Sequence, residues 1–330
     1  MSLDLLNGID NYRKLFMDAE FWQPYVFAAL GKEGLTCKKV RGGIAGTYPT
    51  FIVDDRYVIK FFGRLFNGEK TFEAELHASQ LVKPVPEIPV PALVTQGRLY
   101  DDGSDWSWPY LVFEYLDGIS IGEAWDQLST GSKLEIASEM GQTVRCLHSV
   151  PLGDDRHFKS NWDEFRKFLE LQKTNCAIRI KNTRSLPSHL LGQIDSFLLP
   201  IDRLVETDHN PHLIHSDLTR DHLLGRICNG RWKPSGWIDF GDSMVGNIYY
   251  ELIALHLDLF RCDKHLLEIF LQSYDLETSL RSEFAVRAMN MTLLHQFGEY
   301  ILPDLFNGFP KLRQVNSLKE LADELWEVGK

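Results

Sequence analysis

Apolar runs of strand length dominate the first third of the chain and predict a small antiparallel sheet. The pair Asp54-Asp55 and the segment 101–104 each separate two such runs, a pattern that indicates hairpins. The runs themselves are residues 48–53 and 57–62, then residues 92–100 and 108–115. Between the hairpins, residues 69–82 carry apolar side chains at helical spacing, and a proline-rich segment follows.

Beyond Leu116 the pattern becomes mainly helical, with a few short β-like pieces. Helical spacing predicts helices at residues 121–127, 133–148, 161–172 and 186–207, and again through much of the chain to Val328. Short apolar pieces of strand length lie at residues 213–214, 223–226 and 235–239. The change predicts an α+β chain with two parts, residues 1–116 and residues 117–330.

Length and composition agree with two ordinary globular parts. The chain has 330 residues, of which 44% are apolar and 25% charged, so disordered and fibrous classes are excluded. The 35 basic and 46 acidic residues give a net charge of −11, which disfavours nucleic acid or an anionic membrane as partner and favours a cationic substrate.

The sequence also indicates where the protein resides. No run approaches 18 uncharged apolar residues, and residues 1–17 lack the basic start and apolar run of a signal peptide, so we expect neither a membrane span nor secretion. Five scattered cysteines without a CxxC pair indicate a reducing compartment and argue against a thiolate metal site. We therefore expect a cytoplasmic protein; its oligomeric state is not indicated.

Polar side chains with catalytic potential gather in two short segments with apolar neighbours. His215, Asp217 and His222 lie in the first, and Asp239 and Asp242 follow the apolar pair Trp237-Ile238 in the second. Carboxylates at the ends of short buried segments are costly unless they are paired, hydrogen-bonded or bound to a cation. The pattern indicates a divalent metal and a carboxylate that accepts a proton.

Phosphoryl transfer from a nucleotide requires such a set of groups. It needs a carboxylate to accept the proton of the attacking hydroxyl, oxygen ligands for Mg²⁺, a cation on the phosphates and a flexible glycine loop. Lys60 has only apolar immediate neighbours, which argues against a purely solvent-exposed role. The candidates follow in chain order: the glycines Gly42, Gly43 and Gly46, then Lys60, Asp217 and Asp239.

Several segments, taken together and in order, resemble a known family. They are YVIKFF, FEAELHASQLV, IPVP, PYLVFEYLDG, VRCLHSV, HSDLTRDHLL and IDFGDSMVGNIYYELIAL. The chain resembles the aminoglycoside phosphotransferase and choline kinase group of small-molecule kinases, most weakly before Lys38 and after about Leu257. The resemblance implies a protein-kinase-like two-lobe fold, with a small antiparallel-sheet N-lobe and a mainly helical C-lobe. It also implies transfer of the γ-phosphoryl group of ATP or GTP, with Mg²⁺, to a small-molecule hydroxyl.

The resemblance assigns roles residue by residue. It makes Lys60 the lysine that binds the α- and β-phosphates and Glu75, rather than Glu73, its ion-pair partner. It also implies that the Glu114 carbonyl and the Leu116 amide bind the adenine.

In the second half of the chain, the resemblance makes Asp217 the catalytic carboxylate and Asp239 a metal ligand. His222 stands where the family usually has asparagine. Subgroups resembling 2″-aminoglycoside and macrolide phosphotransferases also carry histidine there, and some of their members favour GTP, so we read His222 as a subgroup mark that holds or supports metal. Glu251 and His215 are interpreted as structural.

Two other interpretations stay open. A nucleotide-binding pseudokinase or sensor would explain His222. A metallohydrolase with zinc or manganese on His215, Asp217, His222 and Asp239 would leave Lys60 and the glycines unexplained. For the kinase interpretation, four acidic residues of the second part would suit an amine-bearing acceptor: Asp163, Glu164, Asp258 and Asp304.

Overall fold

The computed structural model describes residues 3–100, 105–183, 186–205 and 209–329. The turn predicted at residues 101–104 lies outside these residues. The chain forms two compact units: unit 1 contains residues 1–119 and 234–242, and unit 2 contains residues 120–233 and 243–330. The lobe boundary predicted after Leu116 remains a prediction, and the compact units add that residues 234–242 belong with the N-terminal part.

Unit 1 contains an antiparallel sheet, which confirms the predicted fold class for this part of the chain. Within the described residues, the strand order is β1-β2-β3-β5-β4. The strands are β1 (Val40–Gly42), β2 (Thr50–Val53), β3 (Tyr57–Phe61), β4 (Leu93–Arg98) and β5 (Pro109–Glu114). Strand β1 was not predicted; it pairs the glycine segment with β2.

Asp54 and Asp55, with φ of 53° and 50°, are the central residues of the tight turn between β2 and β3, which the Arg56 amide closes by donating to the Val53 carbonyl at 2.9 Å. The helical elements of unit 1 are η1 (Leu3–Asn7), α1 (Ile9–Leu15), α2 (Ala19–Lys32), η2 (Leu65–Asn67), α3 (Gly68–Val82) and η5 (Phe240–Asp242).

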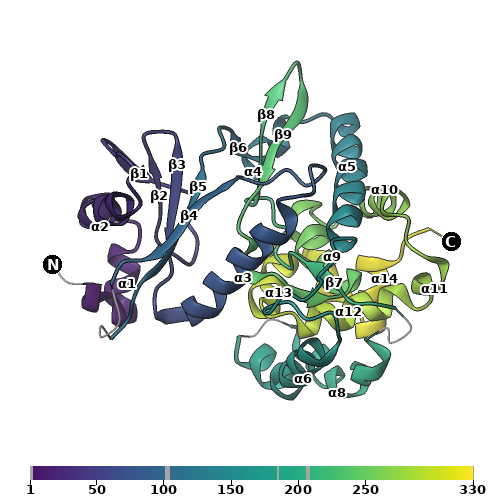
Figure 1. Cartoon of the computed structure of the whole chain (residues 1–330). Coiled ribbons are helices and arrows are strands. Elements are labelled where there is room, and N and C mark those ends of the chain that lie inside the picture. Colours follow the sequence, from purple (N-terminus) through teal and green to yellow (C-terminus); the bar gives the residue numbers. More distant parts are fainter. Residues whose placement is uncertain (1–2, 101–104, 184–185, 206–208, 330) are drawn as a thin grey trace. The chain divides into compact units, whose positions relative to one another are not determined.

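Helices cover both faces of this sheet, and strand alternation decides which side chain meets which helix. Ile59 and Phe61 lie in a core shared with Trp22 of α2. Successive strand residues point to opposite faces, so Lys60 points away from that core. The other face is covered by α3, whose Phe72 packs in a second core with Phe62 and Leu111 (Figure 1). The sheet therefore directs Lys60 toward α3.

Unit 2 is mainly helical. Helices α5 and α10 lie side by side, and α12 packs against both α9 and α14 (Figure 1). Its helical elements are α4 (Ile121–Ala124), η3 (Trp125–Gln127), α5 (Thr130–His148), α6 (Asp163–Thr183), α7 (Ser188–Leu191), α8 (Ile194–Phe197), η4 (Ile201–Arg203), α9 (Ile248–Ala254), the π-helix η6 (Leu255–Leu259), α10 (Lys264–Tyr274), α11 (Thr278–Arg281), α12 (Phe284–Leu294), α13 (Gly298–Gly308), η7 (Pro310–Gln314) and α14 (Leu318–Trp326).

Two further small sheets complete the described strands. In unit 2, β7 (His212–Ile214) pairs antiparallel with β10 (Met244–Gly246). A sheet of order β6-β8-β9 contains residues at which the chain passes from one unit to the other; its strands are β6 (Ile119–Ser120), β8 (Leu223–Cys228) and β9 (Arg231–Trp237). In the part of the chain that the structure describes, no helix is long and apolar enough to span a bilayer.

Three predicted elements differ from the structure. The helix predicted at residues 161–172 is longer, Asp163–Thr183. The single helix predicted at residues 186–207 is wrong: the described part holds three short helical pieces, interrupted at Gly192 and at Pro200. Glycine and proline are the residues that most readily end a helix. The strand predicted at residues 235–239 ends earlier, at Trp237, because Asp239 adopts a left-handed φ of 66°.

Candidate functional site

The predicted glycine segment forms the end of β1 and the start of the loop that leads to β2. Gly42 pairs with Phe51, and the Gly43 amide donates to the Thr50 carbonyl at 2.9 Å. A Cβ on Gly43 would lie 3.0 Å from that carbonyl oxygen, so a side chain there would crowd the neighbouring strand. A Cβ on Gly46 would meet nothing within 4 Å. Gly43 is therefore required by backbone packing, whereas Gly46 lies in open space.

Two tyrosines anchor the far end of this loop. The Tyr12 hydroxyl, from α1, donates to the Thr47 carbonyl at 2.7 Å. The Tyr48 hydroxyl donates to the Phe66 carbonyl at 2.5 Å and lies 3.2 Å from the Thr71 hydroxyl at the start of α3. The loop is thus tied to the helices on both sides of the sheet. Neither tyrosine was predicted from the sequence, because nothing in a lone tyrosine indicates a main-chain partner.

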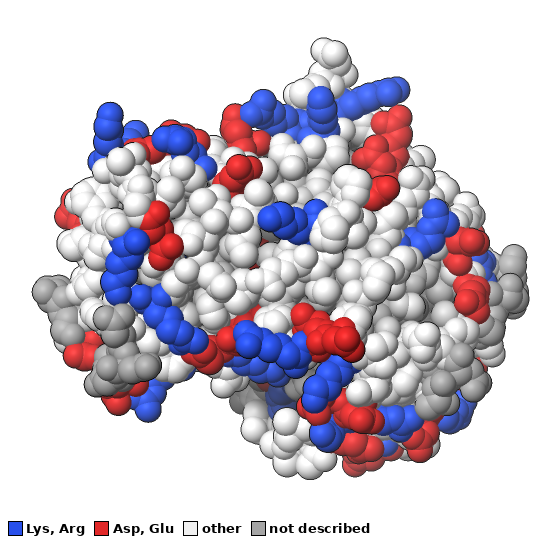
Figure 2. Space-filling view, viewed as in Figure 1, with Lys and Arg blue, Asp and Glu red and all other residues white. Residues whose placement is uncertain are grey.

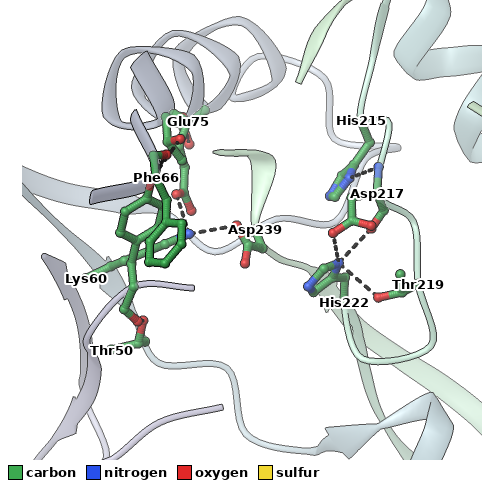
Figure 3. Close-up of polar contacts among 12 residues, drawn as sticks. Thr50, Lys60, Phe66, Glu75, His215, Asp217, Thr219, His222 and Asp239 are labelled. Atoms are coloured by element: carbon green, nitrogen blue, oxygen red, sulfur yellow. Dashed lines mark hydrogen bonds and ion pairs between the residues drawn. The ribbon is translucent and has the colours of Figure 1, made fainter. Parts of the chain in front are cut away.

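Lys60 of β3 lies at the centre of a charged cluster in unit 1. Its Nζ is 2.7 Å from Glu75 Oε2 on α3 and 2.7 Å from Asp239 Oδ1 (Figure 3). Lys60 and Glu75 are buried, with 7% and 4% of their surface exposed, whereas the Asp239 side chain is 33% exposed. The structure therefore brings together three of the predicted residues and favours Glu75 over Glu73, whose carboxylate faces His77 instead.

Electrostatics keep the Lys60 ammonium charged despite its burial. Burial alone lowers the pKa of a lysine, but the carboxylates of Asp239 and Glu75 outweigh it, so the pKa of Lys60 lies above its ordinary value. The rings of Tyr48 and Phe62 lie 5.9 Å and 5.4 Å from Nζ and add favourable contacts with the cation. The cluster supplies a fixed positive charge next to a partly exposed carboxylate.

A tight turn places Asp239 beside Lys60. Asp239 is left-handed, and the next three residues form η5, which packs on α3. A Cβ on Gly241 would lie 2.6 Å from Thr71 Cγ2 and 3.5 Å from Glu75 Oε2. Only glycine lets this turn approach α3 so closely, so Gly241 is a site residue that sequence reasoning missed. The signal was its position two residues after Asp239.

The two predicted adenine-binding residues lie at the end of β5. Glu114 pairs with Tyr57, and its amide donates to the Ala92 carbonyl at 2.9 Å. Leu116 is half-buried, with its Cδ1 against Gly236. Both belong to unit 1, as the predicted nucleotide site requires.

In unit 2, Asp217 and His222 share one short loop after β7. His222 Nδ1 is 2.6 Å from the Asp217 carbonyl oxygen, 3.1 Å from the Thr219 hydroxyl and 3.6 Å from Asp217 Oδ2 (Figure 3). Since a carbonyl oxygen only accepts, Nδ1 carries the hydrogen and Nε2 is the basic nitrogen of this ring. The Asp217 and His222 side chains are 18% and 16% exposed.

Glu251 of α9 holds the start of this loop. Its two carboxylate oxygens accept from the amides of His215 at 2.7 Å and Ser216 at 3.2 Å. The side chain is fully buried, and burial raises its pKa to about 7, while the neighbouring His215 opposes the shift. Here the interpretation of Glu251 as structural agrees with its contacts: it fixes the main chain two residues before Asp217.

Asp258 of the π-helix holds the other side of the loop. Its Oδ2 accepts from the Arg220 amide at 2.8 Å, and its Oδ1 is 2.9 Å from the Arg220 guanidinium. Asp258 was suggested as a ligand for an amine-bearing acceptor. In the structure the Asp258 carboxylate is neutralised by Arg220, and these contacts indicate that Asp258 supports the loop.

The donor groups of each unit can be tested against the predicted metal. A carboxylate such as Asp239 suits Mg²⁺, and its Oδ1 lies 2.7 Å from the Lys60 ammonium. His222 has the arrangement of a metal-binding histidine, with Nδ1–H donating to a carbonyl and Nε2 basic, although imidazole suits softer metals than Mg²⁺. Among the described residues, no three His, Cys, Asp or Glu side chains group as a metal site.

Comparison with known proteins assigns this chain to a family. The model of the phosphotransferase enzyme family matches residues 36–285. The chain belongs to this family. The match spans most of unit 1 and most of unit 2, so the resemblance identified from the sequence is confirmed.

Two curated proteins are similar to parts of this chain at low sequence identity. Aminoglycoside 3'-phosphotransferase of Streptomyces fradiae is 27% identical over 158 residues, which cover 47% of this chain and 52% of that protein. Lysine-specific demethylase JMJ21 of Arabidopsis thaliana is 24% identical over 274 residues, 67% of this chain and 29% of that protein. The chain thus spans about half, or less, of the length of these curated relatives.

A solved structure shows the same fold. The GDP complex of aminoglycoside 2'-phosphotransferase-IIIa superposes with a TM-score of 0.65 at 17% identity, covering 93% of this chain and 98% of that one. The predicted fold class, kinase-like with a small antiparallel sheet and a mainly helical remainder, is therefore confirmed.

Proposed function

We propose that this chain transfers the γ-phosphoryl group of ATP or GTP to a hydroxyl group of a small molecule. The observation that carries the proposal is the Lys60 ammonium, buried and held between Glu75 and Asp239. A fixed cation beside a partly exposed carboxylate suits a triphosphate with its metal, and membership of the phosphotransferase family supports this use.

In this proposal unit 1 binds the nucleotide. Lys60 neutralises the α- and β-phosphates, Glu75 orients it, and the loop that contains Gly42, Gly43 and Gly46 covers the phosphates. The Glu114 carbonyl and the Leu116 amide bind the base. Asp239 would hold Mg²⁺, which neutralises charge on the phosphates when bound. For His222 we propose that it holds or supports a metal.

Unit 2 supplies the proton acceptor. Asp217 accepts the proton of the acceptor hydroxyl while the hydroxyl oxygen attacks the γ-phosphorus. The bond from the γ-phosphorus to the bridging β,γ-oxygen breaks, and the nucleoside diphosphate leaves with that oxygen. Orienting the hydroxyl and removing its proton contribute about 10²–10⁴-fold for a well-placed base.

The acceptor we propose carries amines as well as a hydroxyl. A net charge of −11 favours a cation, and the names of the two curated relatives, an aminoglycoside phosphotransferase and a lysine-specific demethylase, each denote an amine-bearing substrate. On the face shown in Figure 2, acidic and basic side chains are interspersed. Among the described residues, this face therefore offers no large acidic patch that would support a cationic acceptor.

The deciding experiment crosses ATP and GTP with a panel of aminoglycosides, macrolides and amino alcohols, followed by Asp217→Asn. We expect turnover with the best acceptor to fall about 10²–10⁴-fold, while nucleotide affinity stays unchanged. The matched control is Asp221→Asn, an exposed carboxylate four residues along the same loop, which should keep full activity. Normal turnover by Asp217→Asn would exclude Asp217 as the base.

The same panel tests the pseudokinase alternative. Nucleotide binding by thermal shift, with and without Mg²⁺, but no transfer to any acceptor and no nucleotide hydrolysis, would favour a sensor module. The substitution of histidine for asparagine at His222 is the feature that motivates it.

A further inference from the structure

We propose that His295 is a positioning residue that fixes the peptide bond preceding Asp217. The inference rests on the proposed function, because it assumes that Asp217 is the catalytic carboxylate. His295 lies 78 positions after Asp217 in the chain, beyond the segments that resemble known kinases, and no functional role was expected for it.

The hydrogen bonds of His295 define its tautomer. Its Nδ1 lies 3.2 Å from the Phe297 amide, which can only donate, so Nδ1 is the acceptor and Nε2 carries the hydrogen. Nε2 lies 3.3 Å from the Ser216 carbonyl oxygen and donates to it. Burial lowers the pKa of His295 to about 3, so the ring stays neutral near pH 7 and keeps this tautomer.

Packing fixes the ring in this orientation. His295 is fully buried at the end of α12, and its ring stacks on Tyr250 with centroids 4.5 Å apart and an interplanar angle of 23°. The Tyr250 hydroxyl in turn accepts from the Gln296 amide at 3.0 Å. A ring held by stacking and by its own loop has few ways to turn, so the direction of the Nε2–H bond is set.

The bond to Ser216 matters because of where that carbonyl lies. The Ser216 carbonyl belongs to the peptide bond that enters Asp217, so its direction helps to set the starting direction of the Asp217 backbone. Ser216 is left-handed, with φ of 64°, a conformation that costs about 1–2 kcal/mol for a residue with a Cβ.

Two distant side chains hold Ser216 in that conformation. Glu251 binds its amide and His295 binds its carbonyl, so both peptide units that flank Ser216 are fixed from α9 and from the end of α12. Loss of the His295 donor would remove a buried hydrogen bond to this carbonyl and weaken the hold on the peptide.

Unit 2 contains a well-matched control. His256 is also fully buried, its Nε2 lies 2.9 Å from one main-chain carbonyl, that of Leu325, and its ring packs against Trp326. This carbonyl belongs to α14 and not to the Asp217 loop. Substitution of His256 therefore reproduces the general cost of losing a buried histidine.

The test compares three variants in the full chain. His295→Asn keeps an acceptor for the Phe297 amide but is too short to reach Ser216, whereas His295→Gln keeps a donor near the position of Nε2. We expect His295→Asn to lower kcat about tenfold, with KM for the nucleotide within about twofold of the original. His295→Gln should retain most of kcat, and His256→Asn should retain all of it. A tenfold change in kcat corresponds to about 1.4 kcal/mol, the size of one hydrogen bond.

Amide hydrogen exchange supplies a readout that does not depend on activity. We expect faster exchange at residues 216–218 in His295→Asn alone. Equal kcat or equal exchange in His295→Asn and His256→Asn would overturn the proposal. If the original protein transfers phosphate to nothing in the panel, the proposed function fails, and the exchange comparison by itself still decides whether His295 positions the loop. If His295→Asn does not fold, exchange in His295→Gln must match the original protein for the proposal to stand.

Discussion

The two units hold their functional side chains by different physical means. In unit 1, an ammonium and two carboxylates bind one another directly: Lys60 lies between Glu75 and Asp239. In unit 2, Asp217 is positioned through the main chain that precedes it. Glu251 binds the His215 amide, and the neutral ring of His295 binds the Ser216 carbonyl. Charge holds the first site, whereas buried hydrogen bonds to backbone atoms support the second.

This difference predicts different sensitivities. A charge cluster depends on each of its members, because removal of one leaves the others unpaired in a buried place. A loop supported by neutral, buried imidazoles depends instead on those rings remaining neutral. Acid should therefore affect unit 2 through its histidines, and substitution of a single charge should affect unit 1 most.

The largest effect that we expect is acid destabilisation of unit 2. Burial lowers the pKa of His148 and His295 to about 3 and of His212 and His256 to about 4. In the unfolded chain a histidine has a pKa near 6.5. Below that pH the unfolded state therefore binds protons that the folded state does not bind. The stability from these groups is complete above about pH 6.5 and is lost as the pH falls toward 4.

Glu251 opposes this loss, because burial raises its folded pKa to about 7 and the folded state binds its proton first. Burial likewise raises the pKa of Glu75 to about 7, so four histidines less two glutamates leave a net uptake of about two protons on unfolding, or about 3 kcal/mol per pH unit in the steep range. Urea unfolding at pH 7, 6 and 5 measures this slope. His256→Asn should reduce it by about 1.4 kcal/mol per pH unit, and a slope that does not change would contradict the assignment of a neutral His256.

The next effect concerns the charged cluster. Lys60→Met removes the ammonium and leaves the carboxylate of Glu75 buried without its charge partner, so we expect a loss of about 3–5 kcal/mol in the free energy of unfolding. The double substitution Lys60→Met with Glu75→Gln should recover part of it, because the buried charge is then removed. Urea unfolding at pH 7 measures both.

An exposed ion pair serves as the control for this prediction. Lys167 lies 2.7 Å from Glu164, with side chains 72% and 77% exposed. Lys167→Met should leave stability unchanged within error, since exposed pairs are solvated and screened. If Lys60→Met destabilises no more than Lys167→Met does, the cluster in unit 1 is not a structural unit.

The contrast also explains what the sequence could predict. Lys60 stood out because a lysine among apolar strand residues requires a partner, and the family resemblance assigned Glu75 as that partner. The hairpin of β2 and β3 and helix α3 followed from alternation and helical spacing. These features depend on residue type and local pattern, which a single sequence contains.

The missing parts depend on contacts that leave no local pattern. His295, Tyr12 and Glu251 each bind main-chain atoms, and every residue offers the same amide and carbonyl, so the sequence does not indicate the partner. The helix predicted at residues 186–207 failed for a different reason: apolar spacing was given more weight than Gly192 and Pro200. Strand β1 is only three residues long and lies in a glycine segment that reads as a turn.

The smallest effect that we predict concerns the close packing of Gly241 against Thr71 of α3. Gly241→Ala would place a Cβ 2.6 Å from Thr71 Cγ2, and a β-branched side chain on a helix has little freedom to move aside. We expect a loss of about 1–3 kcal/mol in the free energy of unfolding, the usual cost of overpacking. Thr71→Ser removes that methyl group but keeps the hydroxyl that bonds with Tyr48, so Gly241→Ala should cost less in its presence.

Gly31→Ala is the matched control, because a Cβ there would meet nothing within 4 Å and alanine favours the helix. A double-mutant cycle by urea unfolding measures the coupling between Gly241 and Thr71. A coupling of zero would mean that the turn after Asp239 packs less closely on α3 than the structure shows. A smaller cost of Gly241→Ala in the Thr71→Ser background would mean that the carboxylate of Asp239 is held beside Lys60 by the absence of a side chain two residues later as well as by charge.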